Sequence, residues 1–176
     1  MEEEKIYIDA REYLRDSWRL AKMVLEGQWR PDVLLALWRG GAPVGVAVHE
    51  YFKVCGLNVE HLPIKCSSYT GIAQRNQAVD FENFSLALKP HTRVLVVDDI
   101  FDTGNTAAAI HERLKAMECD MRMACVYWNP NHNRTEYKPD YYVRTVECWL
   151  VFPHEIEGLT PAEITKKDPV LAHLLG

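Results

Sequence analysis

A short apolar run that leads directly into carboxylates constrains the fold of this chain more than any other segment. Residues 93–97 are nearly all apolar and β-branched, which is typical of a strand at the buried centre of a parallel sheet. Asp98 and Asp99 follow this run, and we expect them at the carboxyl end of the strand, where open α/β sheets bind ligands. The segment therefore predicts an α/β fold with an anionic site at one sheet edge.

The polar turn Thr103-Gly104-Asn105-Thr106 comes next and precedes a helix-forming stretch. Its backbone N–H groups and hydroxyls can converge at a helix N-terminus, which is one way to hold a phosphate without a lysine. Asp98 and Asp99 favour a metal ion or sugar hydroxyls, so the whole segment indicates a phosphorylated sugar. A P-loop is disfavoured because no Gly-Lys-Ser/Thr ending occurs. A solvated turn with Asp102 or Thr103 as the helix cap is the plainer alternative, but it explains only one carboxylate.

Composition limits the classes of protein to which the chain can belong. Its 176 residues, 48% of them hydrophobic, suit a single domain over residues 1–176. No apolar run approaches the ~18 residues of a membrane span and the start is acidic, so we expect no membrane partner, no secretory signal and a cytoplasmic protein. Five cysteines without a Cys-x-x-Cys pair indicate reduced core residues. A net charge of −5 without a basic cluster argues against nucleic acid as a partner.

Apolar periodicity predicts alternating strands and helices. We expect strands at 33–37, 59–64, 93–97, 122–128, 141–144 and 149–152, and helices at 9–27, 42–55, 104–118 and 160–175. This order is typical of a parallel sheet with right-handed crossovers, flanked by helices. Residues 67–83 are polar and predict a flexible loop, and 129–139 are rich in turn formers.

Several blocks together resemble the type I phosphoribosyltransferases. The segment from Val94 to Thr106 is similar to the signature of that family. The purine branch, especially the bacterial xanthine-guanine (hypoxanthine) enzymes, is resembled by blocks that occur in the same order: Ser17-Trp18, Gln28-Trp29, Arg39-Gly40-Gly41, Ser67-Ser68-Tyr69 with Gln74-Arg75, and Trp149-Leu150-Val151-Phe152-Pro153-His154-Glu155.

The resemblance implies a fold, a reaction and partners. The fold would be the type I phosphoribosyltransferase fold, with a small base-binding hood formed by the N-terminal segment and roughly residues 129–158. The reaction would move ribose 5-phosphate from 5-phosphoribosyl 1-pyrophosphate to N9 of a 6-oxopurine, that is guanine, hypoxanthine or xanthine, for purine salvage. Mg2+ is implied as cofactor, and because family members are commonly dimers or tetramers, a homo-oligomer is expected.

Catalytic roles follow from the resemblance for three carboxylates. Asp98 and Asp99 would bind the ribose hydroxyls and magnesium. Asp102 would accept the proton of purine N7. Positive charge that builds on the ribose during transfer makes such carboxylates electrostatic catalysts.

The resemblance also implies which residues bind the substrate's phosphates. The turn Thr103-Gly104-Asn105-Thr106 would hold the 5-phosphate, and Arg39 and Gly40 the pyrophosphate. A non-proline cis peptide is implied at Trp38–Arg39. Ser68, Tyr69 and Arg75 belong to the flexible catalytic loop of the family, and Lys65 lies just before it. The plainer interpretation of any one of these basic residues is a solvated charge.

Base-binding residues are implied at the end of the chain and after the strand at 122–128. Trp149 would stack on the purine, a carbonyl of Leu150 or Trp149 would accept from it, and Glu155 would help hold magnesium; core packing is the alternative for Trp149. Asn129 stands where the 6-oxopurine enzymes have a lysine, and an amide can donate to a 6-oxo group or accept from a 6-amino group. A regulatory or binding protein that keeps this fold without transfer activity is the alternative function.

Overall fold

The computed structural model describes residues 5–65 and 88–176. In chain order its elements are β1 (Lys5–Tyr7), α1 (Ala10–Glu26), β2 (Val33–Trp38), α2 (Gly41–Val54), β3 (Glu60–Lys65), β4 (Arg93–Phe101), α3 (Asn105–Ala116), β5 (Asp120–Trp128), β6 (Tyr141–Thr145), β7 (Trp149–Val151), α4 (Pro161–Lys167) and α5 (Pro169–Leu175). The loop expected at 67–83, with Cys66 before it, lies outside the described residues.

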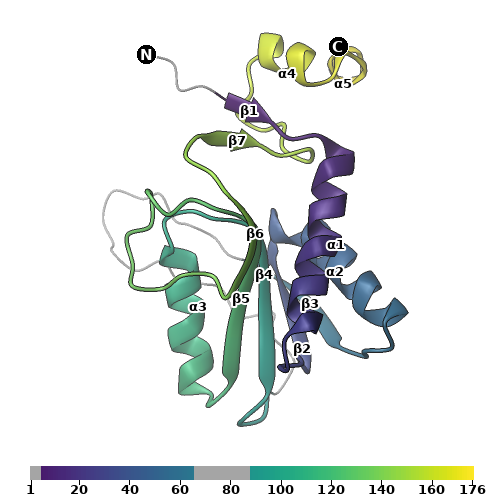
Figure 1. Cartoon of the computed structure of the whole chain (residues 1–176). Helices are drawn as coiled ribbons and strands as arrows, with labels where there is room; N and C mark the ends of the chain where they lie inside the picture. The colour runs from purple at the N-terminus through teal and green to yellow at the C-terminus, as the bar shows by residue number, and fades with distance from the viewer. Residues whose placement is uncertain (1–4, 66–87) are drawn as a thin grey trace. The chain divides into compact units, whose positions relative to one another are not determined.

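A five-stranded sheet in the order β3-β2-β4-β5-β6 forms the centre of the fold, and every neighbouring pair is parallel. Figure 1 shows α3 on one face of this sheet and α1 and α2 on the other. The prediction of a parallel sheet flanked by helices is confirmed. The order reverses between β2 and β4, which makes their carboxyl ends the place where such sheets bind ligands.

Alternate residues of the strands build two cores. On one face Leu35, Val94 and Val96 pack with Ile110 and Leu114 of α3, all of them fully buried. On the other face Gly45 lets α2 approach β2 so closely that an added Cβ would lie 2.6 Å from the Cβ of Ala36. Strands buried on both faces carry few polar residues, which explains why the apolar runs alone predicted them.

The described chain divides into two compact units, residues 14–147 and residues 1–13 with 148–176. The larger unit contains the five-stranded sheet, and the smaller one contains the parallel pair β1-β7, in which Ile6 lies opposite Leu150. β1 was not expected, because its three residues are too few to show alternation. The single domain over 1–176 stays a prediction.

The C-terminal helix differs from the expectation of one helix over 160–175. Two helices form, because Asp168 is extended, with φ −159°, and Pro169 cannot continue the first helix. Asp168 instead caps α5 by accepting from the N–H groups of Val170 and Leu171. The start at Thr160 agrees with the sequence, since Thr160 and Glu163 form a capping box there.

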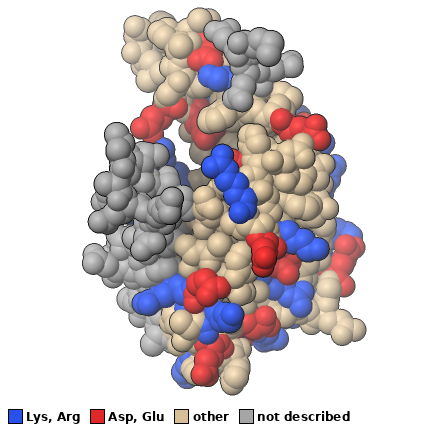
Figure 2. Space-filling view, turned by 90° about the vertical axis from the view of Figure 1, so that its left-hand side faces the viewer, with Lys and Arg blue, Asp and Glu red and all other residues tan. Residues whose placement is uncertain are grey.

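The cysteines fit the expectation only partly. Cys55, Cys119, Cys125 and Cys148 are free thiols, but only Cys125 is buried. Cys55 is the exposed C-cap residue of α2, and Cys119 and Cys148 are partly exposed, so among the described cysteines only Cys125 is the core residue that the sequence predicted. No described helix is long and apolar enough to cross a membrane. On the face that Figure 2 shows, Lys and Arg side chains are interspersed with Asp and Glu rather than gathered in one patch.

Candidate functional site

The strand β4 carries the candidate carboxylates past the end of its neighbour β2. Pairing with β2 stops at Val97, whereas pairing with β5 continues through Phe101. The sequence predicted that the strand ends at 97, but β4 continues to Phe101. Asp98 and Asp99 therefore lie inside the strand rather than after it. The side of β4 that β2 leaves open at this point is where a ligand can approach.

Backbone hydrogen bonds and burial fix the two carboxyl groups. The N–H of Asp99 donates to Asp98 Oδ1 at 3.0 Å, and the N–H of Ile100 donates to Asp99 Oδ1 at 2.8 Å. Burial, and then the negative charge of Asp99, raise the pKa of Asp98 well above its usual range. Asp99 itself is only 7% exposed. A cation or hydroxyl donors placed here would relieve the repulsion between these groups.

The carboxylate oxygens of Asp98 and Asp99 suit magnesium, which prefers oxygen ligands and is commonly held by one or two carboxylates together with substrate phosphates. No group of three or more His, Cys, Asp or Glu residues that could hold a metal ion occurs among the described residues. Asp98 and Asp99 therefore fit an ion that arrives with a phosphorylated substrate better than one held by the protein alone.

The turn Arg39-Gly40-Gly41 packs directly against these carboxylates. A Cβ on Gly40 would lie 2.5 Å from Asp99 Oδ1, and one on Gly41 would lie 3.0 Å from the Cα of Asp98 and still closer to the carbonyl oxygen of Val97. The implied cis peptide at Trp38–Arg39 is present. Glycine is required at both positions because any side chain would collide with β4. The turn between β2 and α2 thus lies beside the carboxylates of β4.

The expected phosphate turn precedes α3. Gly104 is the N-cap residue, with φ 79° and without a side-chain cap, so neither Asp102 nor Thr103 caps the helix as the alternative had it. The N–H of Asn105 reaches Thr103 Oγ1 only at 3.5 Å, which leaves the first turn of the helix suited to an anion. A cavity of about 100 Å³ opens here, and its lining includes Asp98, Asp102, Thr103, Gly104 and Thr106.

The segment between β5 and β6 supports this turn, a role that sequence reasoning missed. The N–H of Arg134 donates to the carbonyl oxygen of Thr103 at 2.9 Å. A Cβ on Gly104 would lie 2.5 Å from Thr135 Oγ1 and 2.6 Å from Asn133 Oδ1. Asn133 Oδ1 also accepts from the N–H of Thr135 at 3.0 Å. Residues 129–139 predicted only turns, and nothing local in them indicated which helix they support.

Asp102 has a side-chain partner that the sequence did not indicate. His132 Nδ1 lies 3.0 Å from Asp102 Oδ1, although the two residues are 30 positions apart. About half of each side chain is exposed. The candidate proton acceptor is thus hydrogen-bonded from the segment that supports the phosphate turn.

Asn129 lies at the end of β5, next to the end of β4. Its N–H donates to the carbonyl oxygen of Phe101 at 2.9 Å, and the residue is 2% exposed. Its side-chain Oδ1 is buried and has no hydrogen-bond partner among the described residues.

Lys65 lies near the turn at Arg39, at the end of β3. Lys65 is the exposed last residue of β3, opposite Trp38 in the register of β2 and β3 and thus next to the turn at Arg39. Ser68, Tyr69 and Arg75 lie outside the described residues. The structure therefore brings together Arg39, Gly40, Asp98 and Asp99, with Asp102 and the phosphate turn following along the same segment.

Trp149, Leu150 and Glu155 belong to the smaller unit, whereas residues 129–147 of the expected hood belong to the larger one. Trp149 is 59% exposed and its neighbour Leu150 is 7% exposed, so Trp149 is not a core residue of β7. Glu155 Oε2 accepts from the N–H of Phe152 at 3.0 Å. Lys167 donates to the carbonyl oxygen of Phe152 at 2.6 Å, which joins α4 to the segment after β7. An exposed indole suits stacking on a flat ligand, as the resemblance implied.

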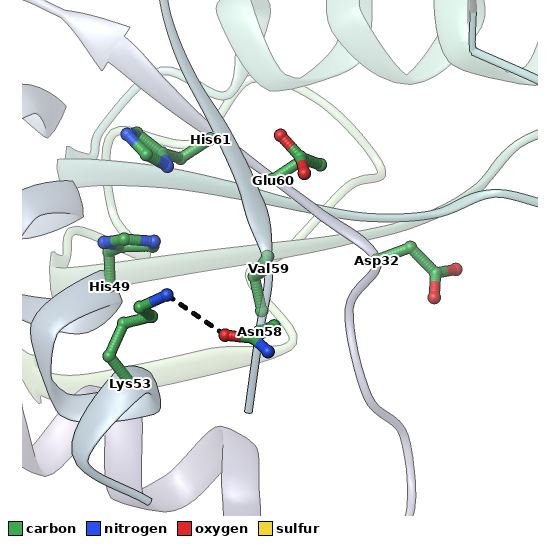
Figure 3. Close-up of a pocket in the computed structure, with 7 residues that line it drawn as sticks. All are labelled: Asp32, His49, Lys53, Asn58, Val59, Glu60 and His61. Carbon is green, nitrogen blue, oxygen red and sulfur yellow. Dashed lines mark hydrogen bonds between the residues drawn. The ribbon is translucent and has the colours of Figure 1, made fainter. Parts of the chain in front are cut away.

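A second cavity of about 410 Å³ lies at the other end of the strands, near the starts of β2 and β3. Figure 3 shows His49, His61 and Lys53 on one side of the chain at Asn58–Val59, with Glu60 and Asp32 pointing away on the other. Lys53 donates to Asn58 at 3.0 Å, and Arg93 pairs with Asp32 at 2.7 Å. None of the predicted site residues lines this cavity, although it is the larger one.

An open parallel sheet with carboxylates and a helix N-terminus at its switch point is an arrangement that suits a ligand carrying a phosphate group. The sequence profile of the phosphoribosyl transferase domain matches residues 5–160. The chain belongs to the phosphoribosyltransferase family, and the resemblance that its motifs predicted, with the enzyme class it implied, is confirmed.

Three relatives that are named as purine phosphoribosyltransferases support this assignment. The chain is 25% identical over 140 residues to a hypoxanthine-guanine phosphoribosyltransferase of Lactococcus lactis, a match that spans 78% of this chain and 74% of the relative. A purine phosphoribosyltransferase of Pyrococcus horikoshii is 26% identical, with a TM-score of 0.71 over 89% of this chain and 97% of that one. The xanthine-guanine-hypoxanthine phosphoribosyltransferase of Helicobacter pylori shares the fold, with 24% identity and a TM-score of 0.68 over 85% and 92% of the two chains.

Proposed function

We propose that this protein is a purine salvage enzyme that transfers ribose 5-phosphate from 5-phosphoribosyl 1-pyrophosphate to N9 of a 6-oxopurine. The observation that carries the proposal is the contact between the glycine turn after β2 and the carboxylates of β4. This contact supports the proposal because it brings the N–H groups of the turn, as candidate pyrophosphate donors, next to the carboxylates that are the candidate ribose ligands. A binding site for the sugar phosphate alone would not need the glycine turn beside the carboxylates.

In the proposed reaction the bond from ribose C1 to the pyrophosphate oxygen breaks while a bond from C1 to purine N9 forms. Asp98 and Asp99 hold the ribose hydroxyls and favour the positive charge that develops on the ring. The first turn of α3 holds the 5-phosphate, and Arg39 with the N–H groups of its turn receives the leaving pyrophosphate. Asp102 accepts the proton that leaves N7.

Magnesium would be held by Asp98 and Asp99 together with substrate oxygens, with Glu155 as a further candidate ligand. When bound, it neutralises the charge of the pyrophosphate and makes it a better leaving group. Because two adjacent carboxylates supply only part of the oxygen ligands that magnesium needs, we expect the ion to be taken up together with the substrate phosphates.

The base is the part of the proposal that depends on Asn129 and Trp149. Trp149 offers an exposed ring for stacking. The Asn129 amide can donate to the 6-oxo group, and its buried Oδ1 can instead accept from a 6-amino group.

Phosphorylated substrates do not cross membranes freely, which favours a cytoplasmic location.

The test is direct. The purified chain is incubated with magnesium chloride, 5-phosphoribosyl 1-pyrophosphate and guanine, xanthine, hypoxanthine or adenine in turn, and nucleotide is measured by chromatography. Nucleotide from any of the three 6-oxopurines supports the proposal, and AMP alone would move the assignment to an adenine enzyme. If no base reacts while the pyrophosphorylated ribose still binds in calorimetry, a regulatory or binding protein is the better interpretation.

Asp102→Asn provides the control for the proposed proton acceptor. The neutral amide cannot take the N7 proton, so turnover falls by about 100-fold or more, within the range that general bases contribute. Binding of 5-phosphoribosyl 1-pyrophosphate, measured by calorimetry, stays close to the wild-type value. Turnover near the wild-type rate would remove Asp102 from the reaction.

A further inference from the structure

We infer that His132 is a positioning residue for transfer, acting through Asp102; this inference rests on the proposed function. The observation is the hydrogen bond between His132 Nδ1 and Asp102 Oδ1, 3.0 Å long. An ionised carboxylate can only accept, so Nδ1 carries the proton and donates it. The bond fixes one oxygen of the carboxylate.

Two backbone hydrogen bonds hold this contact in place. The N–H of Asn129 donates to the carbonyl oxygen of Phe101, and the N–H of Arg134 donates to that of Thr103, each at 2.9 Å. His132 lies between Asn129 and Arg134 in the sequence, and Asp102 lies between Phe101 and Thr103. The two segments are therefore joined on either side of the side-chain contact, which is what a rigid orientation requires.

The second carboxylate oxygen of Asp102, Oδ2, is the one that can accept the proton of the base. Asp102 makes no other side-chain hydrogen bond with the described part of the chain, so Oδ2 is available for the proton of the base. The side chain is 43% exposed and would otherwise rotate among its rotamers. Holding it in one orientation places the acceptor before the base arrives, and misplacement of a reacting group by about 1 Å can cost a large factor in rate.

The bond contributes little to folding, because an exposed pair of this kind stabilises a protein only slightly. A kinetic effect without a stability effect is therefore its signature. Asn131 precedes His132, is exposed, and makes no side-chain hydrogen bond or ion pair with the described part of the chain, which makes Asn131→Ala a matched control in the same segment.

The experiment measures kcat and KM for 5-phosphoribosyl 1-pyrophosphate in the wild type, His132→Ala, His132→Asn, His132→Gln and Asn131→Ala. We expect His132→Ala to lower kcat about tenfold, as loss of a hydrogen bond to a charged group does, with KM and the melting temperature nearly unchanged. Asn restores kcat to within about threefold, because its Nδ2 is attached to Cγ as Nδ1 of histidine is. Gln places its amide one carbon farther out and does not restore it.

In an Asp102→Asn background, His132→Ala should cause no further loss in single-turnover rate, since both substitutions remove the same function. Wild-type kcat in His132→Ala refutes the inference, and so does an equal loss of kcat and of 5-phosphoribosyl 1-pyrophosphate binding, which indicates a structural role. If the wild-type protein itself forms no nucleotide with any base, the proposed function fails instead. An active wild type with an unaffected His132→Ala variant overturns the role of His132 alone.

Discussion

Replacing Gly40 by alanine tests the contact on which the site depends. The φ and ψ of Gly40, −61° and −38°, suit alanine, so the backbone is not strained by the change. The added Cβ would lie 2.5 Å from Asp99 Oδ1, inside the range that real Cβ atoms avoid. Asp99 is 7% exposed and its Oδ1 is held by the N–H of Ile100, so it cannot simply rotate away.

The expected cost follows from that collision. Overpacking of this kind destabilises proteins by about 1–3 kcal/mol. For a chain of this length such a cost lowers the melting temperature by roughly 2–12 °C. Because the group that must move is a proposed ribose ligand, we also expect affinity for 5-phosphoribosyl 1-pyrophosphate to fall at least about tenfold, the equivalent of losing one hydrogen bond to a charged group.

Two other glycines separate stability from binding. Gly45→Ala places a Cβ 2.6 Å from the Cβ of Ala36, a similar collision inside the core and away from the carboxylates. Gly27→Ala meets nothing closer than 3.5 Å. Urea unfolding and calorimetry at a temperature where all three variants are folded should show stability loss in Gly40→Ala and Gly45→Ala, binding loss only in Gly40→Ala, and neither in Gly27→Ala. Wild-type affinity in Gly40→Ala would refute the proposed arrangement.

Three further substitutions have definite expected outcomes. Asp99→Asn removes the charge that helps raise the pKa of Asp98, so urea unfolding at pH 7 should show a more stable protein, while nucleotide formation falls. Gly104→Ala forces a side chain onto a residue with φ 79° beside Asn133, and should lower both the melting temperature, by a few degrees, and phosphate affinity in calorimetry. The hydrogen bond from Lys5 is the main reason that the pKa of Glu163 falls to about 2. A carboxyl whose pKa is lowered on folding stabilises the fold above its ordinary pKa, and this stabilisation is lost as pH falls from about 4.5 towards 2; circular dichroism of Glu163→Gln should show a shallower acid transition over that range.

Features carried by one continuous segment were predictable from the sequence. The inner strands β2, β4 and β5 of the central sheet are largely buried, so apolar runs of four to eight residues predicted them. The phosphate turn and the carboxylates of β4 are contiguous, and their spacing indicated the ligand class before any fold was known. The cis peptide at Trp38–Arg39 followed only from the resemblance, because nothing in those two residues requires it.

Features that depend on two distant segments were not predictable. His132 and Asn133 look like ordinary turn residues, and their importance arises only because the chain after β5 folds back to the end of β4. The extension of β4 to Phe101 was missed because Asp98 and Asp99 are unfavourable strand residues, and pairing with β5 overrides that preference. The break at Pro169 is different, since a proline within a helical pattern commonly ends the helix before it, so this break was predictable from the sequence.

The contact of Gly40 with Asp99 also has a consequence for assembly of the protein during folding. The two residues come from different halves of the larger unit and meet only when β2 and β4 are paired in register, Ala36 opposite Val97. Such non-local pairing forms late, because a long intervening chain must first be closed into a loop. Binding of 5-phosphoribosyl 1-pyrophosphate should therefore return with the slowest phase of refolding, and a chain cut between β3 and β4 should regain it only when the two fragments reassociate.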